Sequence, residues 1–162
     1  MRPANLMVVA QTLVVCLILT PVWPGRCETM SPATPSKTIM LPKPRYAGDI
    51  SVEQALRARR SVRSYKDDAL DMTEISQILW SAQGITSARG FRTAPSAGAL
   101  YPLELYLIAG NIKDLPAGIY NYRPGDHALR EIVPGDRRSD LSRAALRQSS
   151  IKKAPAVILL SL

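Results

Sequence analysis

Histidine, cysteine and aromatic residues are all scarce in this chain. Its 162 residues include one histidine and two cysteines, and the aromatic residues amount to 6%. Cys16 and Cys27 form no metal-binding motif, because such motifs need more ligands at a closer spacing. A basic groove with so few aromatic side chains also gives nucleic-acid bases no surface on which to stack. The sequence therefore predicts neither a metal site nor a nucleic-acid-binding protein.

The charge balance is strongly basic. The chain has 21 Lys and Arg against 13 Asp and Glu, a formal net charge of +8. Such a balance is typical of proteins that bind nucleic acid or anionic membranes. Because the charges are scattered, we favour a phosphate-bearing cofactor and a generally basic surface. The single His127 follows a turn-like Pro124-Gly125-Asp126, so we expect a surface residue rather than a ligand or a base.

Residues 1–28 have the features of an export segment. Arg2 precedes an apolar stretch over residues 6–22, which is short for a membrane span and suits the hydrophobic part of a signal peptide. No clean cleavage site follows, so a membrane anchor formed by residues 6–22 is the alternative. We expect an exported protein, periplasmic or otherwise extracytoplasmic. After cleavage at most Cys27 would remain, which excludes an intrachain disulfide.

The rest of the chain divides into a linker and one domain. Residues 29–48 contain four prolines and predict a proline-rich linker. The folded part is expected to begin near Asp49, and residues 49–162 are numerous enough for a real core. After two helices, whose start signals are described next, the patterns predict a strand over 103–109 and a strand pair over 118–122 and 129–133. They further predict a helix from Asp136 to about Arg147 and a buried strand over 155–160.

Two helices carry clear start signals. Ser51 and Gln54 form a capping box, which predicts a helix that runs to about Arg60. Asp71 and Glu74 form a second capping box, at the start of a helix predicted over residues 72–83 and ended by Gly84. The predicted apolar face of this second helix consists of Ile75, Ile78, Leu79 and Ala82.

The arginine-rich stretch after the first helix is one candidate site. Residues 61–65 read Ser-Val-Arg-Ser-Tyr and predict an extended chain, in which alternate side chains share a face. Arg59, Ser61 and Arg63 could therefore converge on one ligand, and two guanidiniums with a hydroxyl suit a phosphate. A solvated basic helix end, favoured by the helix dipole, is the alternative interpretation.

A stretch of small residues is the other candidate. Residues 92–102 contain no carboxylate, and Pro95 and Pro102 bound their small-residue part. Few side chains there would keep the backbone from approaching a flat ligand closely. An ordinary turn between a helix and the following strand is the alternative interpretation.

Three segments together resemble the nitroreductase superfamily of flavin enzymes, and most closely its SagB-type dehydrogenase branch. They cover residues 59–65, 79–86 and 93–102, in matching order and spacing. The resemblance implies an α+β fold, a three-layer α/β/α sandwich with a central, mainly antiparallel sheet. It also implies an FMN-dependent oxidoreductase that works by ping-pong hydride transfer, with the flavin at a homodimer interface. The electron donor, a nicotinamide or another molecule, and the substrate, a small molecule or a peptide, stay open.

The resemblance further assigns cofactor contacts. Arg59, Arg60 and Ser61 match positions that hold the flavin phosphate and ribityl chain, and Arg63 matches a cation near the pyrimidine edge of the ring. A cation is apt there, because reduction places negative charge on that edge. The segment that packs near the ring, contributed by the other subunit, corresponds to Pro95, Ser96, Ala97, Gly98 and Leu100. No residue is assigned a catalytic role, since the cofactor carries the hydride chemistry.

The chain stops inside its last predicted strand, whereas the fold of the family continues. An unpaired apolar edge invites aggregation, so we expect a truncated protein or a gene fragment whose sheet is incomplete at the C-terminus and which lacks later cofactor contacts. Two alternatives to an enzyme follow. One is a non-catalytic flavin- or phosphate-binding remnant, and the other is a basic envelope or interaction domain without a cofactor.

Overall fold

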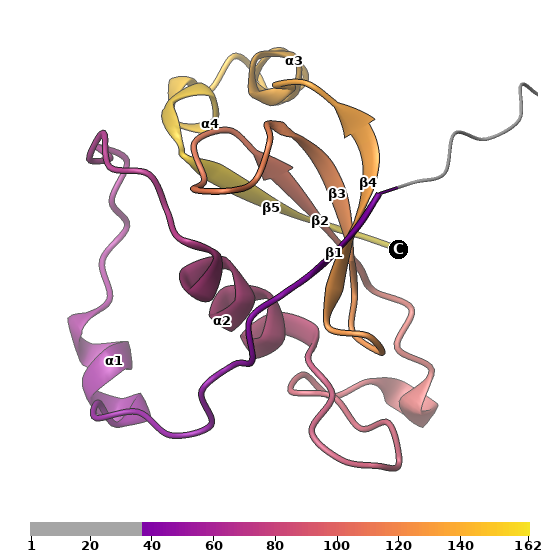
Figure 1. The fold of residues 1–162 in the computed structure, drawn as a ribbon. Helices are drawn as coiled ribbons and strands as arrows, with labels where there is room; N and C mark the ends of the chain where they lie inside the picture. The colour runs from indigo at the N-terminus through magenta and orange to yellow at the C-terminus, as the bar shows by residue number, and fades with distance from the viewer. Residues whose placement is uncertain (1–36) are drawn as a thin grey trace, which may run out of the picture. The chain divides into compact units, whose positions relative to one another are not determined.

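Five antiparallel strands form the centre of the structure, a computed structural model that describes residues 37–162. The strands have the order β1-β4-β3-β2-β5 (Figure 1). They are β1 (Thr38–Met40), β2 (Glu104–Ala109), β3 (Gly118–Arg123), β4 (Ala128–Pro134) and β5 (Ala156–Ser161). The helices are α1 (Val52–Ala58), α2 (Met72–Gln83), α3 (Arg138–Ala144) and α4 (Ser149–Lys153), and η1 (Ala97–Ala99) is a 3-10 turn.

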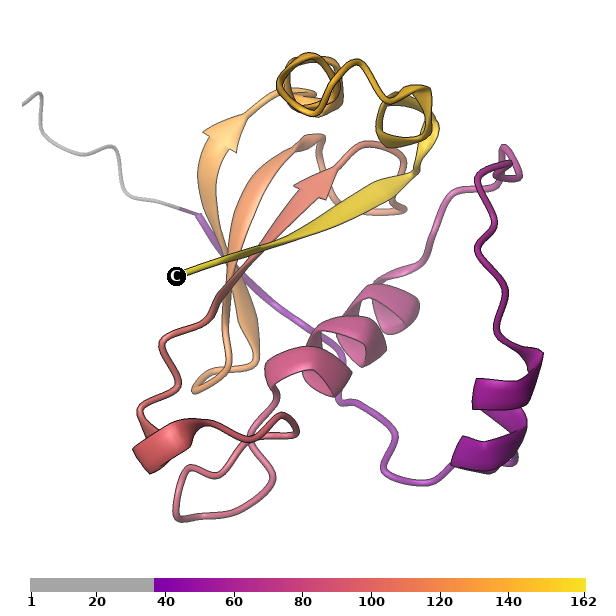
Figure 2. The same cartoon turned by 180° about the vertical axis from the view of Figure 1, so that it is seen from behind.

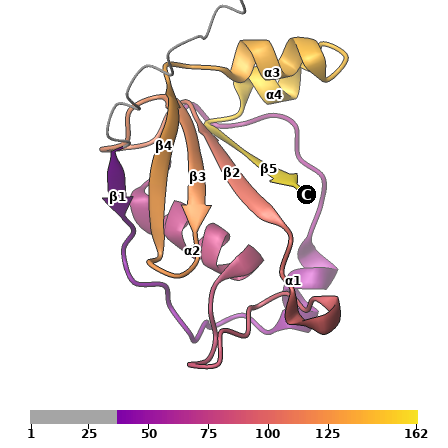
Figure 3. The ribbon, with the colours of Figure 1, turned by 90° about the vertical axis from the view of Figure 1, so that its right-hand side faces the viewer.

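The alternation of side chains along β2 explains how helices cover the sheet. Leu105 and Leu107 belong to the core beneath α2, whereas Tyr106 and Ile108 line the opposite face. On that opposite face, α3 and the sheet border an apolar groove of about 640 Å³. In Figure 3, α2 runs behind the fanned strands, and α3 and α4 lie at their upper end. The α+β sandwich predicted from the sequence is therefore confirmed.

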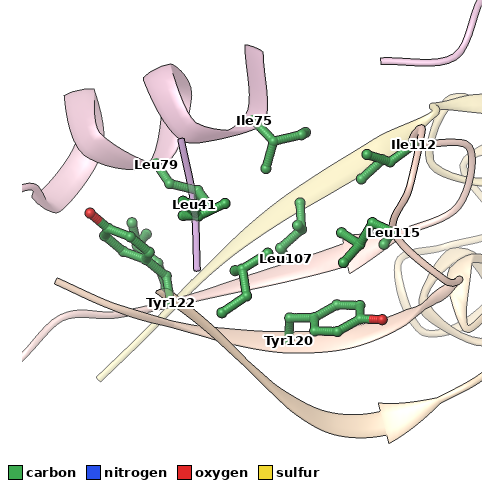
Figure 4. Packing of buried hydrophobic residues seen from close by; sticks show 11 residues of the cluster. Leu41, Ile75, Leu79, Leu107, Ile112, Leu115, Tyr120 and Tyr122 are labelled. Atoms are coloured by element: carbon green, nitrogen blue, oxygen red, sulfur yellow. The ribbon is translucent and has the colours of Figure 1, made fainter. Parts of the chain in front are cut away.

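The main core lies between α2 and the sheet. Ile75 and Leu79 project from α2 toward Leu107 on β2 and Tyr120 on β3, and all four side chains are almost fully buried (Figure 4). Burying an apolar side chain of this size stabilises the folded state by about 1.5–3 kcal/mol. The Tyr120 hydroxyl donates to the Pro116 carbonyl at 2.9 Å, so its polar end is also satisfied.

A strand that precedes the expected domain boundary belongs to the sheet. Ile39 of β1 lies opposite Leu129 of β4, and Leu41 then enters the core. The expected start of the folded part near Asp49 is therefore wrong, and residues 38–41 are not linker. The prolines misled the prediction because Pro42 follows this short edge strand rather than interrupting it.

Both predicted capping boxes are present. The Ser51 side chain accepts the N–H of Gln54 at 3.2 Å, and the Gln54 side chain accepts the N–H of Ser51 at 3.2 Å. The corresponding distances between Asp71 and Glu74 are 2.8 and 2.9 Å. These local signals placed the starts of α1 and α2 correctly.

The buried face of α2 differs from the predicted one. Ile75 and Leu79 are buried as expected, but Ile78 is 46% exposed. Ser76 and Gln83 are buried in its place. The Ser76 hydroxyl donates to the Pro42 carbonyl, and Gln83 accepts from the Arg92 side chain. A polar group with a partner tolerates burial, so polarity alone did not identify the buried face.

The helix predicted from Asp136 to about Arg147 is shorter and is followed by a second one. Asp136 makes no N-cap in the structure and instead binds the backbone and guanidinium of Arg138. Helix α3 ends at Ala144, and Leu146 and Arg147 take left-handed φ values of 55° and 59°. Since non-glycine residues in that region interrupt a helix, α4 forms a separate turn-sized helix.

The last strand is an edge strand. β5 pairs with β2, with Ile158 opposite Leu107, and within residues 37–162 no strand pairs with its other edge. Leu160 is 59% exposed. The prediction of a fully buried strand is therefore wrong, since an apolar run reports hydrophobicity but not its number of neighbours.

No helix within the described residues is long and apolar enough to cross a membrane. The export segment predicted over residues 1–28 lies outside the described part of the chain, as do residues 29–36 of the predicted linker.

Candidate functional site

The two candidate segments lie on opposite sides of the described domain. Figures 1 and 2 show α1 and the stretch that follows it beyond one side of α2, and η1 with its loop beyond the other side. A single copy of the chain therefore does not bring residues 59–63 together with residues 95–100.

The stretch after α1 exposes its cations. Arg59 is the C-cap residue of α1, and its N–H donates to the Ala55 carbonyl at 2.9 Å. Residues 59–64 are exposed, and no regular strand forms over residues 61–65, where the sequence predicts an extended chain. Within residues 37–162, no carboxylate lies within ion-pair distance of Arg59, Arg60 or Arg63. These guanidiniums are therefore not neutralised by the described domain and suit an anion.

Arg60 differs from its neighbours because it turns back onto its own helix. Its Nη1 donates to the Arg57 carbonyl at 2.9 Å and to the Arg59 carbonyl at 2.8 Å. Carbonyls in the last turn of a helix lack partners within the helix, and a basic side chain that binds them stabilises the helix end. For Arg60, the structure therefore agrees with the alternative interpretation, in which a basic side chain stabilises the end of the helix.

Left-handed residues shape the loop of small residues. Gly98, Ala99 and Tyr101 have φ values of 62°, 55° and 47°. The Ser96 hydroxyl accepts the N–H of Tyr101 at 3.0 Å and closes the turn. Leu100 is 81% exposed. Left-handed backbone is unfavourable for non-glycine residues and persists only where its surroundings impose it. The loop thus presents backbone and one large apolar side chain, that of Leu100, to solvent.

Arg92 and Tyr101 close the base of this loop. The backbone N–H of Arg92 donates to the Tyr101 hydroxyl at 3.3 Å, and the guanidinium lies 4.8 Å from the centroid of the Tyr101 ring. Its Nη1 also donates to Gln83 Oε1 at 3.1 Å. Sequence reasoning did not single out Arg92. The available signal was a lone cation in a segment without carboxylates.

His127 joins three segments. Its Nδ1 lies 2.9 Å from the Tyr122 hydroxyl, and its Nε2 lies 2.8 Å from Ser76 Oγ and 3.0 Å from the Pro42 carbonyl. Burial raises the pKa of Tyr122 to about 12, so its hydroxyl keeps a proton to donate. His127 does lie in the predicted turn, but it is only partly exposed and has three partners. The sequence predicted the turn but not these three contacts, which hold the ring in place.

Comparison with known proteins identifies the family. The model of the nitroreductase family matches residues 56–161, and the chain belongs to this family. It is 41% identical over 113 residues to MJ1384 of Methanocaldococcus jannaschii, itself only provisionally named a nitroreductase, in a match that covers 70% of this chain and 57% of that protein. It is 28% identical over 109 residues to the trifolitoxin operon protein TfxC of Rhizobium leguminosarum bv. trifolii, which covers 58% of this chain and 31% of TfxC.

A solved structure supports the fold. The crystal structure of a provisionally named nitroreductase from Ralstonia eutropha JMP134 matches with a TM-score of 0.65 and 28% identity. That match covers 78% of this chain and 56% of the other. The chain therefore spans little more than half the length of MJ1384 and of this structure. Membership of the family supports an oxidoreductase-type function.

Members of the nitroreductase family generally use flavin cofactors, and their fold usually forms dimers. The donor chemistry of the described residues fits a phosphate-bearing flavin. Arg59 and Arg63 are exposed cations without a described carboxylate partner, and the Ser61 hydroxyl lies between them in sequence. Within residues 37–162, no group of three or more His, Cys, Asp or Glu could hold a metal ion.

Proposed function

We propose that this chain carries the cofactor-binding segments of an FMN-dependent oxidoreductase of the SagB-type dehydrogenase branch, active as a homodimer. The observation that carries the proposal is the pair Arg59 and Arg63, exposed and unneutralised at the start of the matched family region. The assignment to the branch rests on the sequence motifs at residues 59–65, 79–86 and 93–102.

Each residue has a distinct proposed task. Arg59 and Ser61 bind the phosphate and the ribityl chain, and Arg60 contributes less because one of its nitrogens already binds the end of α1. Arg63 holds a positive charge beside the pyrimidine edge, where it favours the reduced ring. Bound FMN supplies the hydride chemistry, in a ping-pong exchange between a nicotinamide or other donor and a small-molecule or peptide substrate.

The partner subunit is needed to complete the proposed site. Residues 59–63 and 95–100 lie on opposite sides of α2 in one chain, so both cannot contact the same ring within it (Figures 1 and 2). In a homodimer, the exposed Leu100 and the backbone of Ala97 and Gly98 would cover the flavin held by the other copy. This arrangement also accounts for the solvent exposure of both segments in a single chain.

The alternative that we propose is a non-catalytic flavin- or phosphate-binding remnant of such an enzyme. It is supported by the same exposed pair, Arg59 and Arg63, because unneutralised guanidiniums suit a phosphate whether or not a reaction follows. Visible spectra of purified protein separate these functions: yellow protein that bleaches with a nicotinamide donor supports the enzyme, and yellow protein that does not bleach supports the remnant. Protein that binds no flavin contradicts both.

Replacing Arg59, the proposed phosphate contact, or Arg63, the proposed ring contact, should weaken FMN binding. A lost charge-assisted hydrogen bond reduces affinity about ten- to a hundredfold, so we expect this loss in Arg59→Ala and in Arg63→Ala. Arg63→Ala should also lower the flavin reduction potential. Quenching of FMN fluorescence during titration measures the affinity. Arg143→Ala is the matched control, because Arg143 is an exposed arginine already paired with Asp140. Equal affinity and potential in all variants would refute the assignment.

We also propose that residues 1–28 direct export, with membrane anchoring by residues 6–22 as the alternative. The apolar stretch and the preceding Arg2 support this proposal. The mature N-terminus should lie between about Cys27 and Met30. Mass spectrometry of soluble and membrane fractions tests it, and an intact Met1 on soluble cytoplasmic protein is the contrary result.

A further inference from the structure

We propose that Arg92 binds the carboxylate of an aromatic substrate in the cleft between the loop of residues 92–102 and the turn that joins β3 to β4. This proposal rests on the proposed function, because the cleft adjoins the segment assigned to the flavin ring. The cleft has a volume of about 430 Å³. Arg92 and Tyr101 line it from the loop, and Asn121, Arg123 and Gly125 line it from the hairpin.

Arg92 is held in place without being neutralised. The buried Gln83 side chain accepts one of its guanidinium N–H groups, and the Tyr101 ring lies 4.8 Å from the guanidinium carbon. A guanidinium has five N–H donors, and within residues 37–162 no carboxylate pairs with this one. A cation that is fixed by other contacts loses little side-chain freedom on binding an anion.

The other charged groups of the cleft favour Arg92 as the anion-binding group. Arg123 already pairs with Asp126 at 2.9 Å. The Glu104 carboxylate accepts a hydrogen bond from the Tyr106 hydroxyl and lines the β2 side of the cleft. Its charge repels an anion from that side and so directs a carboxylate toward Arg92. The Asn121 amide donates to the Leu105 carbonyl at 3.4 Å.

The chemistry of the walls suggests the class of ligand. The Tyr101 ring offers a flat apolar surface beside the cation, and the loop that contains it continues to the exposed Leu100. An aromatic carboxylate can bind Arg92 through its anionic end while its ring lies against Tyr101. Its remaining end would then extend toward the segment proposed to cover the flavin.

Binding of benzoate and benzamide to the flavin-free full chain tests the proposal independently of activity. NMR titration should show benzoate binding that weakens about tenfold in Arg92→Gln, while the weaker binding of benzamide stays unchanged. Arg123→Gln is the control, since it removes a cation of the same cleft that is already paired. It should leave the affinity for benzoate within about twofold. Thermal denaturation of each variant confirms that it is folded.

Reduction of 4-nitrobenzoate and 4-nitrobenzamide by FMN-loaded protein gives a second readout. Arg92→Gln should raise KM for 4-nitrobenzoate about tenfold at similar kcat, and it should leave 4-nitrobenzamide unaffected. If the protein reduces neither compound, the proposed function fails, and the benzoate titration still decides the role of Arg92. The inference is overturned if benzoate does not bind, if Arg123→Gln weakens benzoate as much as Arg92→Gln does, or if Arg92→Gln weakens FMN but not benzoate.

Discussion

The Leu79→Ala variant is expected to lose about 2–5 kcal/mol of unfolding free energy, because a buried leucine leaves a cavity that its surroundings only partly fill. Leu79 is fully buried in the cluster between α2 and the sheet, together with Ile75, Leu107 and Tyr120 (Figure 4). These neighbours come from three different elements, so none can close the cavity without moving a strand or the helix. Urea denaturation of the full chain, followed by circular dichroism, measures the loss.

The neighbouring Ile78→Ala variant is the matched control. Ile78 is 46% exposed, so its truncation removes less buried surface, and we expect a loss below about 1 kcal/mol. Both substitutions place alanine at adjacent positions of α2, so the effect of helix propensity is small and similar. Equal losses in the two variants would show that α2 presents the face predicted from the sequence rather than the face in the structure.

Gly110→Ala is expected to destabilise the protein by about 1–3 kcal/mol, because the Arg138 side chain must move and lose charge-assisted hydrogen bonds. A Cβ at Gly110 would lie 2.0 Å from the guanidinium carbon of Arg138. That guanidinium donates to the Asp136 carboxylate and, at 2.7 Å, to the Ala154 carbonyl. Displacing it therefore breaks the contact that ties the start of α3 to the end of α4.

Three further variants isolate this mechanism: Gly48→Ala, Arg138→Ala and a double variant. Gly48→Ala should change stability by less than about 1 kcal/mol, since a Cβ there meets no atom within 4 Å. In the double variant Gly110→Ala with Arg138→Ala, the clash is absent, so the combined loss should fall short of the sum of the single losses. Thermal denaturation of the four proteins gives this comparison. Additive losses would mean that Gly110 matters for another reason, such as its backbone.

Both candidate segments, residues 59–63 and 95–100, are largely exposed to solvent in the described domain. Substitutions in residues 59–63 or 95–100 remove few contacts within the described domain, so they should alter cofactor binding more than the stability of a single chain. Substitutions at Leu79 in the core or at Gly110 beside Arg138 should instead lower stability more than they alter cofactor binding. A variant that lowers FMN affinity without lowering the unfolding free energy therefore indicates that the substituted residue contacts FMN directly.

The sequence by itself determined the elements whose signals are local. The starts of α1 and α2 follow from hydrogen bonds between residues three apart, such as Asp71 with Glu74. The hairpin of β3 and β4 follows from a turn sequence between two alternating runs, and the structure pairs Tyr122 with Leu129 across it. The family could also be inferred, because its motifs are short and contiguous.

Only the tertiary structure decided what depends on residues far apart in the chain. The pairing of β1 with β4 places Ile39 opposite Leu129, whereas the prolines of residues 29–48 predicted a linker there. The burial of Ser76 depends on a carbonyl at Pro42 and on His127, its bonding partner 51 positions later. The sequence likewise did not predict where the arginine stretch lies relative to the loop at Gly98. The physical reason is the same in each case: burial and hydrogen-bond partners arise from long-range packing, whereas sequence patterns report only nearby spacing.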